Sequence, residues 1–188
     1  MSKSNSLSFK EKLAVLWFSI DAFTHLTIEA GYLWLALTTT AIKTDTWMGS
    51  VWRQYGRADA RWEVFDPNVI SLELLTVLLI GPLCLIQIYG VINRTSWRHM
   101  NQIVICVAEI YGGWMTFCPE WVDGNRNLNG STFILLWIYL VFMNGLWVAL
   151  PGLFLWESCG LYTDVSNINI SISIDVYIGI ILLYTTMI

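Results

Sequence analysis

The stretch FTHLTIEAGYLWL, residues 23–35, decides the fold because it places ionisable side chains inside a long apolar run. His25 and Glu29 lie four residues apart there, and Asp21 precedes His25 by the same interval. Residues with this spacing share one face of an α-helix. Lipid and apolar cores both disfavour charge, so this face must meet polar partners or a cavity.

The composition is that of a membrane protein. Of the 188 residues, 56% are hydrophobic and 13% are charged, whereas soluble domains average about 25% charged residues. The net charge of −4 comes without a run of Lys or Arg, so nucleic acid is not an expected partner. The four cysteines form neither a CxxC pair nor the spacing of a zinc site. We expect no metal and no other cofactor.

Four apolar spans approach or exceed the roughly 20 residues that cross a bilayer as a helix. They are residues 13–37, 69–92, 100–118 and 133–156. Helix is the expected conformation because lipid cannot satisfy exposed backbone N–H and C=O groups. A further Ile-rich stretch, residues 172–188, is interrupted by Asp175 and is either a fifth span or an interfacial segment.

The sequence therefore predicts an all-α fold, a polytopic bundle of four to five transmembrane helices with a cavity opening to the bilayer. Residues 1–12 form a cytosolic or lumenal N-terminal tail. Residues 13–156 form the transmembrane domain, and residues 157–188 form a C-terminal tail that contains the additional apolar stretch.

Further polar side chains lie inside the later spans. Glu73 and Thr76 lie near the start of the second, Glu109 lies in the third, and Asn144 and Trp147 share a face of the fourth. A charged residue at the bilayer centre costs about 2.5–3.5 kcal/mol, so the acids should face each other or a cavity. Two structural alternatives stay open: helix–helix hydrogen bonding for Asn144 and capping or snorkelling for Glu73.

Five motifs occur in order along the chain. They are HLTIE (25–29), VWRQYGRADARW (51–62), LELLT with GPL (72–83), IYG (110–112) and FMNGLWVALPG (142–152). With them the sequence resembles the emopamil-binding protein family, the sterol Δ8–Δ7 isomerase branch of the EXPERA-domain membrane proteins. The resemblance covers about residues 13–156. It implies a helical bundle with a ligand cavity, as a multi-pass protein of the endoplasmic reticulum membrane.

The same resemblance implies functional roles for particular positions. It implies catalytic roles for His25, Glu29, Glu73 and Asn144. It implies roles in substrate binding or cation stabilisation for Trp147, Thr76, Tyr55 and Asp59. We add Asp21 and Glu109 to this second group, because they are further acids inside the spans. Shifting an unactivated C=C bond requires a proton donor, a stabilised carbocation and a base. A carboxyl in an apolar pocket, an imidazole and an indole face suit these tasks.

The sequence also departs from the family pattern. The family typically has a neutral residue at the position of Asp21, Gln at Glu109 and Asp at Gly113. Three hypotheses follow: an isomerase of a sterol or related isoprenoid, a terpenoid or meroterpenoid cyclase with the same acid pocket, and a non-catalytic sterol-binding or transport protein. The expected partners are a sterol or isoprenoid substrate and the lipid bilayer, with a homodimer left open.

Overall fold

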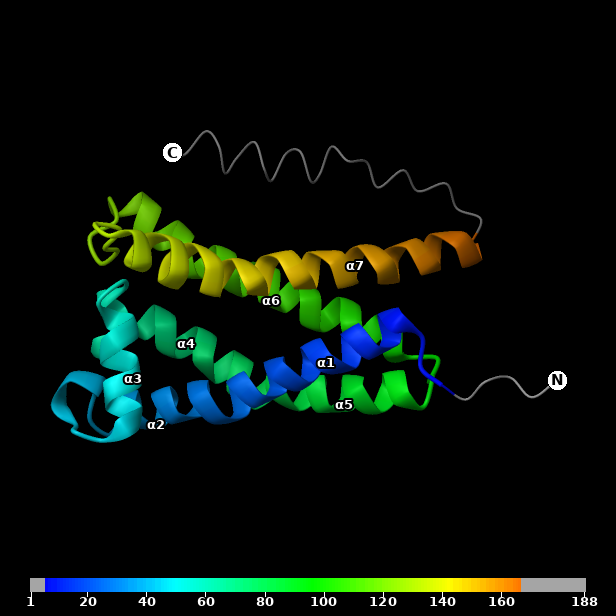
Figure 1. Cartoon of the computed structure of the whole chain (residues 1–188), viewed down its shortest axis with the longest axis horizontal. Coiled ribbons are helices and arrows are strands. Elements are labelled where there is room, and N and C mark those ends of the chain that lie inside the picture. Colours follow the sequence, from blue (N-terminus) through cyan, green and yellow to red (C-terminus); the bar gives the residue numbers. More distant parts are fainter. Residues whose placement is uncertain (1–5, 167–188) are drawn as a thin grey trace.

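The computed structural model describes residues 6–166, which form a bundle of helices (Figure 1). The first helix is continuous over 30 residues from Phe9 to Thr38. It consists of α1 (Phe9–Phe23), the π-helical turn η1 (Thr24–Glu29) and α2 (Ala30–Thr38). A capping box between Ser8 and Glu11 starts it, so the helix begins four residues before the predicted span.

The second long helix runs from Pro67 to Ile92. It comprises α4 (Pro67–Leu75), the π-helical turn η4 (Thr76–Ile80) and α5 (Gly81–Ile92). The Asp66 side chain caps it by accepting a hydrogen bond from the Val69 N–H, and Pro67 occupies the first turn, where no N–H is needed. α1 packs along α5, which lies beside it in Figure 1.

The remaining helices form a second packed pair and a short segment, residues 41–63, which is called the crossing segment below. α6 spans Arg98–Val122, and the π-helical η5 (Ile134–Met143) continues into α7 (Asn144–Ser166). α6 and α7 pack along each other above the α1–α5 pair in Figure 1. Between α2 and α4, the chain forms three short helices at one end of the bundle: η2 (Ala41–Lys43), α3 (Trp47–Gly56) and η3 (Ala60–Glu63).

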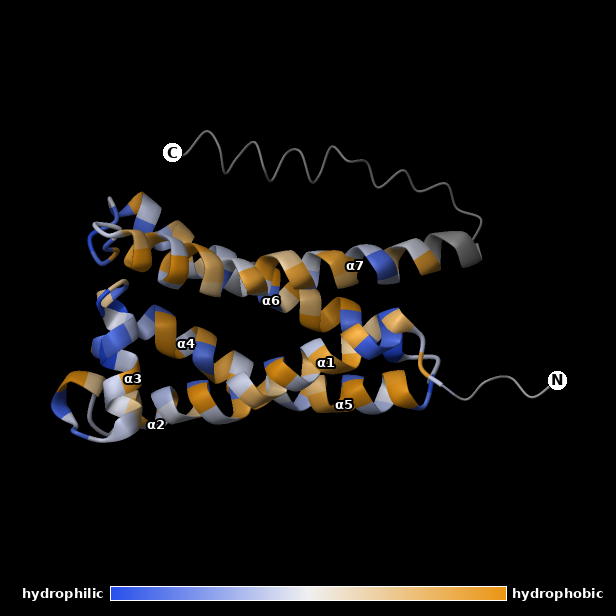
Figure 2. Ribbon diagram, viewed as in Figure 1, coloured by the Kyte–Doolittle hydropathy of each residue, from blue (hydrophilic) through white to orange (hydrophobic). Residues whose placement is uncertain are grey.

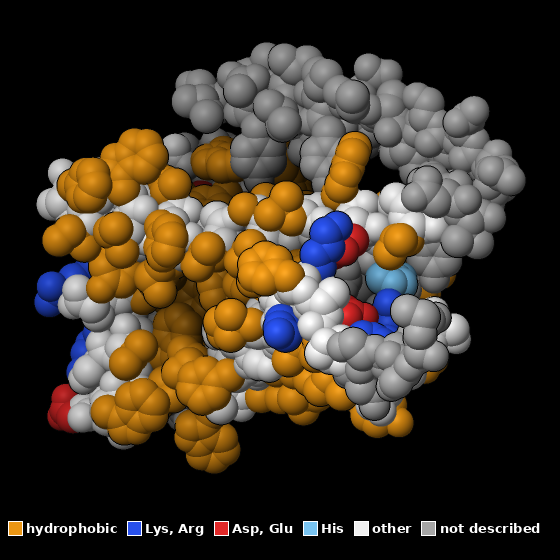
Figure 3. Space-filling model, turned by 45° about the vertical axis from the view of Figure 1, so that its right-hand side comes forward, with side chains coloured by type: hydrophobic (Ala, Val, Ile, Leu, Met, Phe, Trp, Pro, Cys, Tyr) orange, Lys and Arg blue, Asp and Glu red, His pale blue; other side chains and the backbone are white. Residues whose placement is uncertain are grey.

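Three helical segments are long and apolar enough to cross a membrane. They are Phe9–Thr38, Pro67–Ile92 and Ile134–Leu161. Hydrophobic residues extend along these ribbons in Figure 2, and hydrophobic side chains cover much of the face in Figure 3. Within residues 6–166 the all-α prediction is confirmed.

The predicted third span, 100–118, lies in α6, a helix of 25 residues that is not among the three apolar segments. Its hydropathy is lowered by polar side chains that face the protein: Gln102, Glu109 and Glu120 are all buried. The predicted apolar stretch at residues 172–188 lies outside the described residues.

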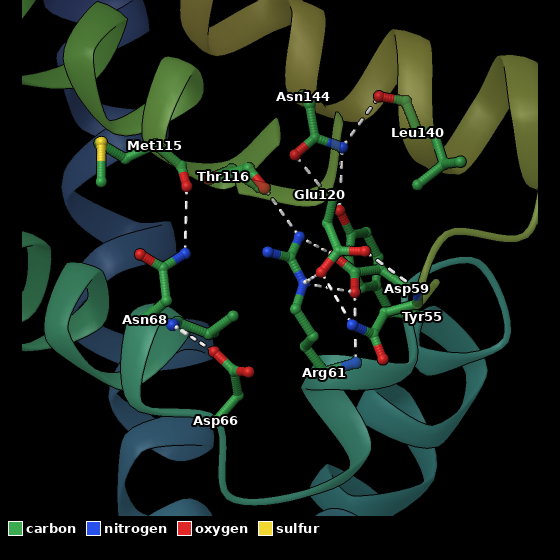
Figure 4. A network of polar contacts seen from close by, with 12 residues as sticks. Tyr55, Asp59, Arg61, Asp66, Asn68, Met115, Thr116, Glu120, Leu140 and Asn144 are labelled. Carbon is green, nitrogen blue, oxygen red and sulfur yellow. Dashed lines mark hydrogen bonds and ion pairs between the residues drawn. The ribbon is translucent and has the colours of Figure 1, made fainter. Parts of the chain in front are cut away.

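A buried arginine locks the crossing segment to the end of α6 (Figure 4). Arg61 Nε and Nη2 donate to the two carboxylate oxygens of Asp59 at 2.9 and 2.6 Å, and Nη2 also donates to the Thr116 carbonyl at 2.8 Å. The Glu120 carboxylate lies 3.5 Å from Arg61 Nε. Burial disfavours the charged guanidinium, but the hydrogen bonds and charge of Asp59, helped by Glu120, outweigh this and raise the pKa of Arg61.

The Glu120 carboxylate and the backbone around Asp59 also hold the loop that follows α6. Glu120 accepts hydrogen bonds from the Asn127 N–H and from its Nδ2, at 3.0 and 2.8 Å. Backbone bonds from Ala60 N to Asn127 O and from Asn129 N to Ala58 O join this loop to the turn around Asp59. Two segments distant in sequence are thereby held together at one end of the bundle.

Arg61→Ala should destabilise the protein by about 3–5 kcal/mol, because it leaves two buried carboxylates without their cation. The measurement is the thermal unfolding midpoint of the detergent-solubilised protein. Arg126→Ala is the matched control, since Arg126 forms an exposed i,i+3 ion pair with Asp123, and such pairs contribute little to stability. Equal unfolding midpoints for the two variants would contradict a structural role for the Arg61 ion pairs.

Candidate active site

A pocket of about 690 Å³ lies between the two helix pairs and the crossing segment. This volume is within the usual range for small-molecule sites. Aromatic side chains contribute to its walls: Trp52, Tyr55 and Trp62 from the crossing segment, and Tyr139 and Trp147 from η5 and α7. No Lys or Arg is among the described residues that line it.

His25 lies at the wall of this pocket and is contacted by carboxyls on both sides of its ring. Nδ1 contacts Glu29, one turn later on the same helix. Nε2 lies 3.1 Å from Asp21 Oδ1 and 3.2 Å from Glu109 Oε1, which comes from α6. His25 and Glu29 both belong to the π-helical turn η1, a widened turn that is frequent at functional sites.

Glu29 is connected to the second long helix through Thr76. The Thr76 Oγ1 hydroxyl donates to Glu29 Oε2 at 3.0 Å, and it also lies 3.4 Å from Glu73 Oε2. Glu73 is buried and lines the pocket together with Glu29 and Thr76. The two glutamates therefore approach the pocket from opposite helices with a hydroxyl between them.

Asp21 lies behind His25 and does not line the pocket. Its Oδ1 accepts a hydrogen bond from Trp147 Nε1 at 2.8 Å, and its Oδ2 accepts one from Cys84 Sγ at 3.1 Å. Trp147 thus has its N–H on a carboxylate while its side chain lines the pocket. In the predicted stripe of Asp21, His25 and Glu29, the two acids contact opposite nitrogens of the His25 ring.

Asn144 lies at the junction of η5 and α7 and binds the crossing segment (Figure 4). Its Nδ2 donates to Tyr55 Oη at 2.9 Å and to the carbonyls of Tyr139 and Leu140 at 2.9 and 3.0 Å. Burial raises the pKa of Tyr55, which therefore stays a neutral phenol at physiological pH. Asn144 thus joins a π-helical turn to α3 beside the pocket.

The structure brings together most of the residues that the sequence singled out. Eight of them line the pocket: His25, Glu29, Tyr55, Glu73, Thr76, Glu109, Asn144 and Trp147. Asp59 is not among the lining residues, and its carboxylate instead accepts hydrogen bonds from Arg61. Sequence reasoning missed Cys84, whose contact with Asp21 depends on the packing of α1 against α5 and has no local signal.

The residue types at His25 Nε2 also match a cation site. Asp21, His25 and Glu109 each offer one ligand atom, and these atoms lie within 4.8 Å of one another. Two carboxylates and an imidazole suit a divalent metal by donor type. The same atoms are, however, at hydrogen-bond distance from the imidazole nitrogen, so protons can occupy this space instead. The expectation of a metal-free site stays a prediction.

The chain is similar to known proteins of one family. The family profile described as EXPERA (expanded EBP superfamily) matches residues 47–158. A 3-beta-hydroxysteroid-Delta(8),Delta(7)-isomerase of Cavia porcellus is 33% identical over 157 residues, which cover 83% of this chain and 67% of the relative.

More distant relatives cover a similar share of the chain. A probable 3-beta-hydroxysteroid-Delta(8),Delta(7)-isomerase of Oryza sativa subsp. japonica is 28% identical over 148 residues, 79% of this chain and 66% of the relative. An isomeliandiol synthase of Melia azedarach is 23% identical over 145 residues, 76% of this chain and 66% of the relative. By the profile match and by these relatives, the chain belongs to the EXPERA, or expanded EBP, superfamily.

Proposed function

We propose that this chain is a membrane-embedded isomerase that shifts a C=C bond in a sterol or a related isoprenoid. One observation carries the proposal: two glutamates and a carboxyl-bound imidazole line one pocket with aromatic walls. Relatives named as sterol Delta(8),Delta(7)-isomerases support the substrate class.

The reaction needs one proton in and one proton out. A protonated carboxyl gives its proton to one alkene carbon, which leaves a carbocation on the neighbouring carbon. A carboxylate then takes a proton from the carbon on the other side of the cation, and the C=C bond has moved by one position. Glu29 and Glu73 supply this pair of groups, and Thr76 lies between them. The exchange is balanced because one glutamate loses a proton and the other gains one.

The walls of the pocket protect the cation. The Trp147 indole faces the pocket, and an indole face stabilises a desolvated cation by about 2 kcal/mol or more. No Lys or Arg is among the described lining residues, and the carboxyls around His25 balance any charge on its ring. Apolar walls also keep water from trapping the cation as an alcohol.

A protonation-initiated cyclase is the second candidate. The observation in its favour is that Asp21 and Glu109 bring two more carboxyls to His25, more acid than a double-bond shift requires. The relative named isomeliandiol synthase supports a wider range of isoprenoid substrates. Membranes are given either an 8-ene sterol or a linear or epoxidised prenylated substrate, and analysis of the products separates the isomerase from the cyclase. Tight sterol binding without turnover of either substrate class would favour a transport protein.

The membrane arrangement is part of the same proposal. α6 crosses the bilayer as a fourth span with its polar side chains on α7 and the pocket, and the pocket opens toward the lipid. We place the protein in the endoplasmic reticulum membrane as a multi-pass protein. Residues 13–156 carry the activity, although the helices that frame them begin earlier, at Phe9, and continue to Ser166.

Glu73→Gln and Glu29→Gln should each lower kcat by about 10²–10⁴-fold, the usual effect of losing a general acid or base. The measurement is conversion of an 8-ene sterol to its 7-ene isomer by gas chromatography and mass spectrometry. In deuterated water the product should carry one deuterium. Gln54→Leu is the control, since Gln54 also lines the pocket but carries no acid. A product free of deuterium would contradict solvent-exchangeable acid chemistry.

An amphiphilic tertiary amine should inhibit more strongly than its neutral carbon isostere, because the ammonium mimics the cation and meets carboxyls in a pocket without Lys or Arg. A charge-assisted hydrogen bond contributes about 1.5–3 kcal/mol, so Glu73→Gln should weaken amine binding about tenfold or more while leaving binding of the isostere unchanged. Inhibition constants for both compounds on both proteins test this. Equal losses for the two compounds would mean that Glu73 shapes the pocket without attracting charge.

Removal of divalent metals should leave the rate unchanged. The proposed steps use only carboxyls, an imidazole and an indole, and a cation at His25 Nε2 would compete with the protons there. Dialysis of the solubilised enzyme against a strong chelator, followed by metal analysis and assay, tests this. Loss of rate on dialysis and its recovery with one added metal ion would instead assign Asp21, His25 and Glu109 to a metal site.

A further inference from the structure

The Nε2 side of His25 is not used by the proposed proton transfers. Glu29 occupies Nδ1 and reaches the pocket, whereas Asp21 and Glu109 both face Nε2. An imidazolium has two N–H donors, but a neutral imidazole has only one. His25 therefore has acceptors in place for both donors of the charged ring.

Among the described residues, the polar partners of Asp21 other than Glu109 are hydrogen-bond donors. Trp147 Nε1–H donates to Oδ1 and Cys84 Sγ–H donates to Oδ2. An ionised carboxylate is an acceptor only, and it fits this set without any unsatisfied proton. Asp21 is also fully buried, so its charge has to be balanced within the bundle.

Glu109 is arranged differently. Its Oε1 faces His25 Nε2, but its buried Oε2 has no hydrogen-bond partner among the described residues. An unpaired oxygen costs less on a neutral carboxyl than on a carboxylate. Asp21 and Glu109 would also repel one another if both were ionised, because their oxygens lie close together. Glu109 is therefore the carboxyl of this pair that keeps a proton.

We infer that Asp21 is a positioning residue, a buried counter-ion that holds His25 as an imidazolium. This inference rests on the proposed function for its effect on rate. The fixed imidazolium donates through Nδ1–H to Glu29 and holds that carboxyl at the pocket wall. His25 keeps both its protons during turnover, and the protons that move are those of Glu29 and Glu73. Asp21 acts through His25 because it does not line the pocket.

Nitrogen NMR of the full chain in lipid bilayers reads the charge of the ring directly. The protein contains two histidines, so labelling with [15N]histidine gives few signals, and His99→Gln assigns them. Wild-type His25 should show two protonated ring nitrogens. Asp21→Asn should produce one unprotonated nitrogen, whereas Glu109→Gln should retain the imidazolium. A neutral His25 in the wild type would overturn the inference whatever the protein does to a sterol.

Rate measurements on variants separate a positioning role of Asp21 from a role in packing alone. Asp21→Asn should lower kcat about 10–100-fold with KM nearly unchanged, as loss of an orienting carboxylate does. Cys84→Ser, which keeps a donor to Asp21, and Cys106→Ser, a buried change one turn before Glu109, should retain the rate. Unchanged kcat in Asp21→Asn, or an equal loss in the Cys106→Ser control, would overturn the inference.

The two arms fail in different ways. A wild-type protein that does not convert an 8-ene sterol but holds a charged His25 would refute the proposed function and support the counter-ion. A wild-type protein that converts the sterol with a neutral His25 would support the proposed function and refute the counter-ion role of Asp21. In His25→Gln, a further Asp21→Asn change should add little to the loss of kcat, since Asp21 acts through the ring that is already absent. Additive losses would count against the coupling.

Discussion

The contacts of one buried imidazole with carboxyls on both of its sides are the interaction on which the site depends. A carboxylate or imidazolium facing lipid would cost several kcal/mol, so these groups must find each other inside the bundle. Asp21 and Glu29 reach His25 from its own helix, and Glu109 reaches it from α6. Through Asp21, the cluster also contacts α5 and α7, at Cys84 and Trp147. The pocket is therefore formed where four long segments share one polar cluster.

Much of the fold could be predicted, because the membrane permits few alternatives. Lipid offers no hydrogen-bond partners to the backbone, so long apolar spans must be helical. Three of the predicted spans lie in the three apolar helices of the structure. α6 is harder to recognise by hydropathy, since its polar side chains are buried against protein. Its true extent, Arg98–Val122, exceeds the predicted 100–118 because the helix includes Arg98 and His99 at its start and continues through Pro119 and Glu120 at its end.

The site was predictable to the extent that it follows helical periodicity. The interval of four residues placed Asp21, His25 and Glu29 on one face, and the structure has them in contact. The π-helical turns at η1 and η4 have no such signal, because their wider hydrogen-bonding pattern depends on packing and not on spacing. The pairing of Asp59 with Arg61 is local in sequence, yet its partner Glu120 comes from a distant helix.

The two buried ionic clusters differ in their balance of charge, and this difference separates structure from chemistry. Around Arg61, a guanidinium that is always charged meets carboxylates whose oxygens are taken up by donors, so no proton needs to move. Around His25, three carboxyls share a single imidazole, Glu109 Oε2 has no hydrogen-bond partner among the described residues, and no described Lys or Arg lines the pocket beside them. Such an excess can be held in an apolar bundle only if some carboxyls keep protons or a cation enters. A site that must store protons beside an apolar pocket can protonate an alkene, and one that attracts a cation can stabilise the carbocation that results.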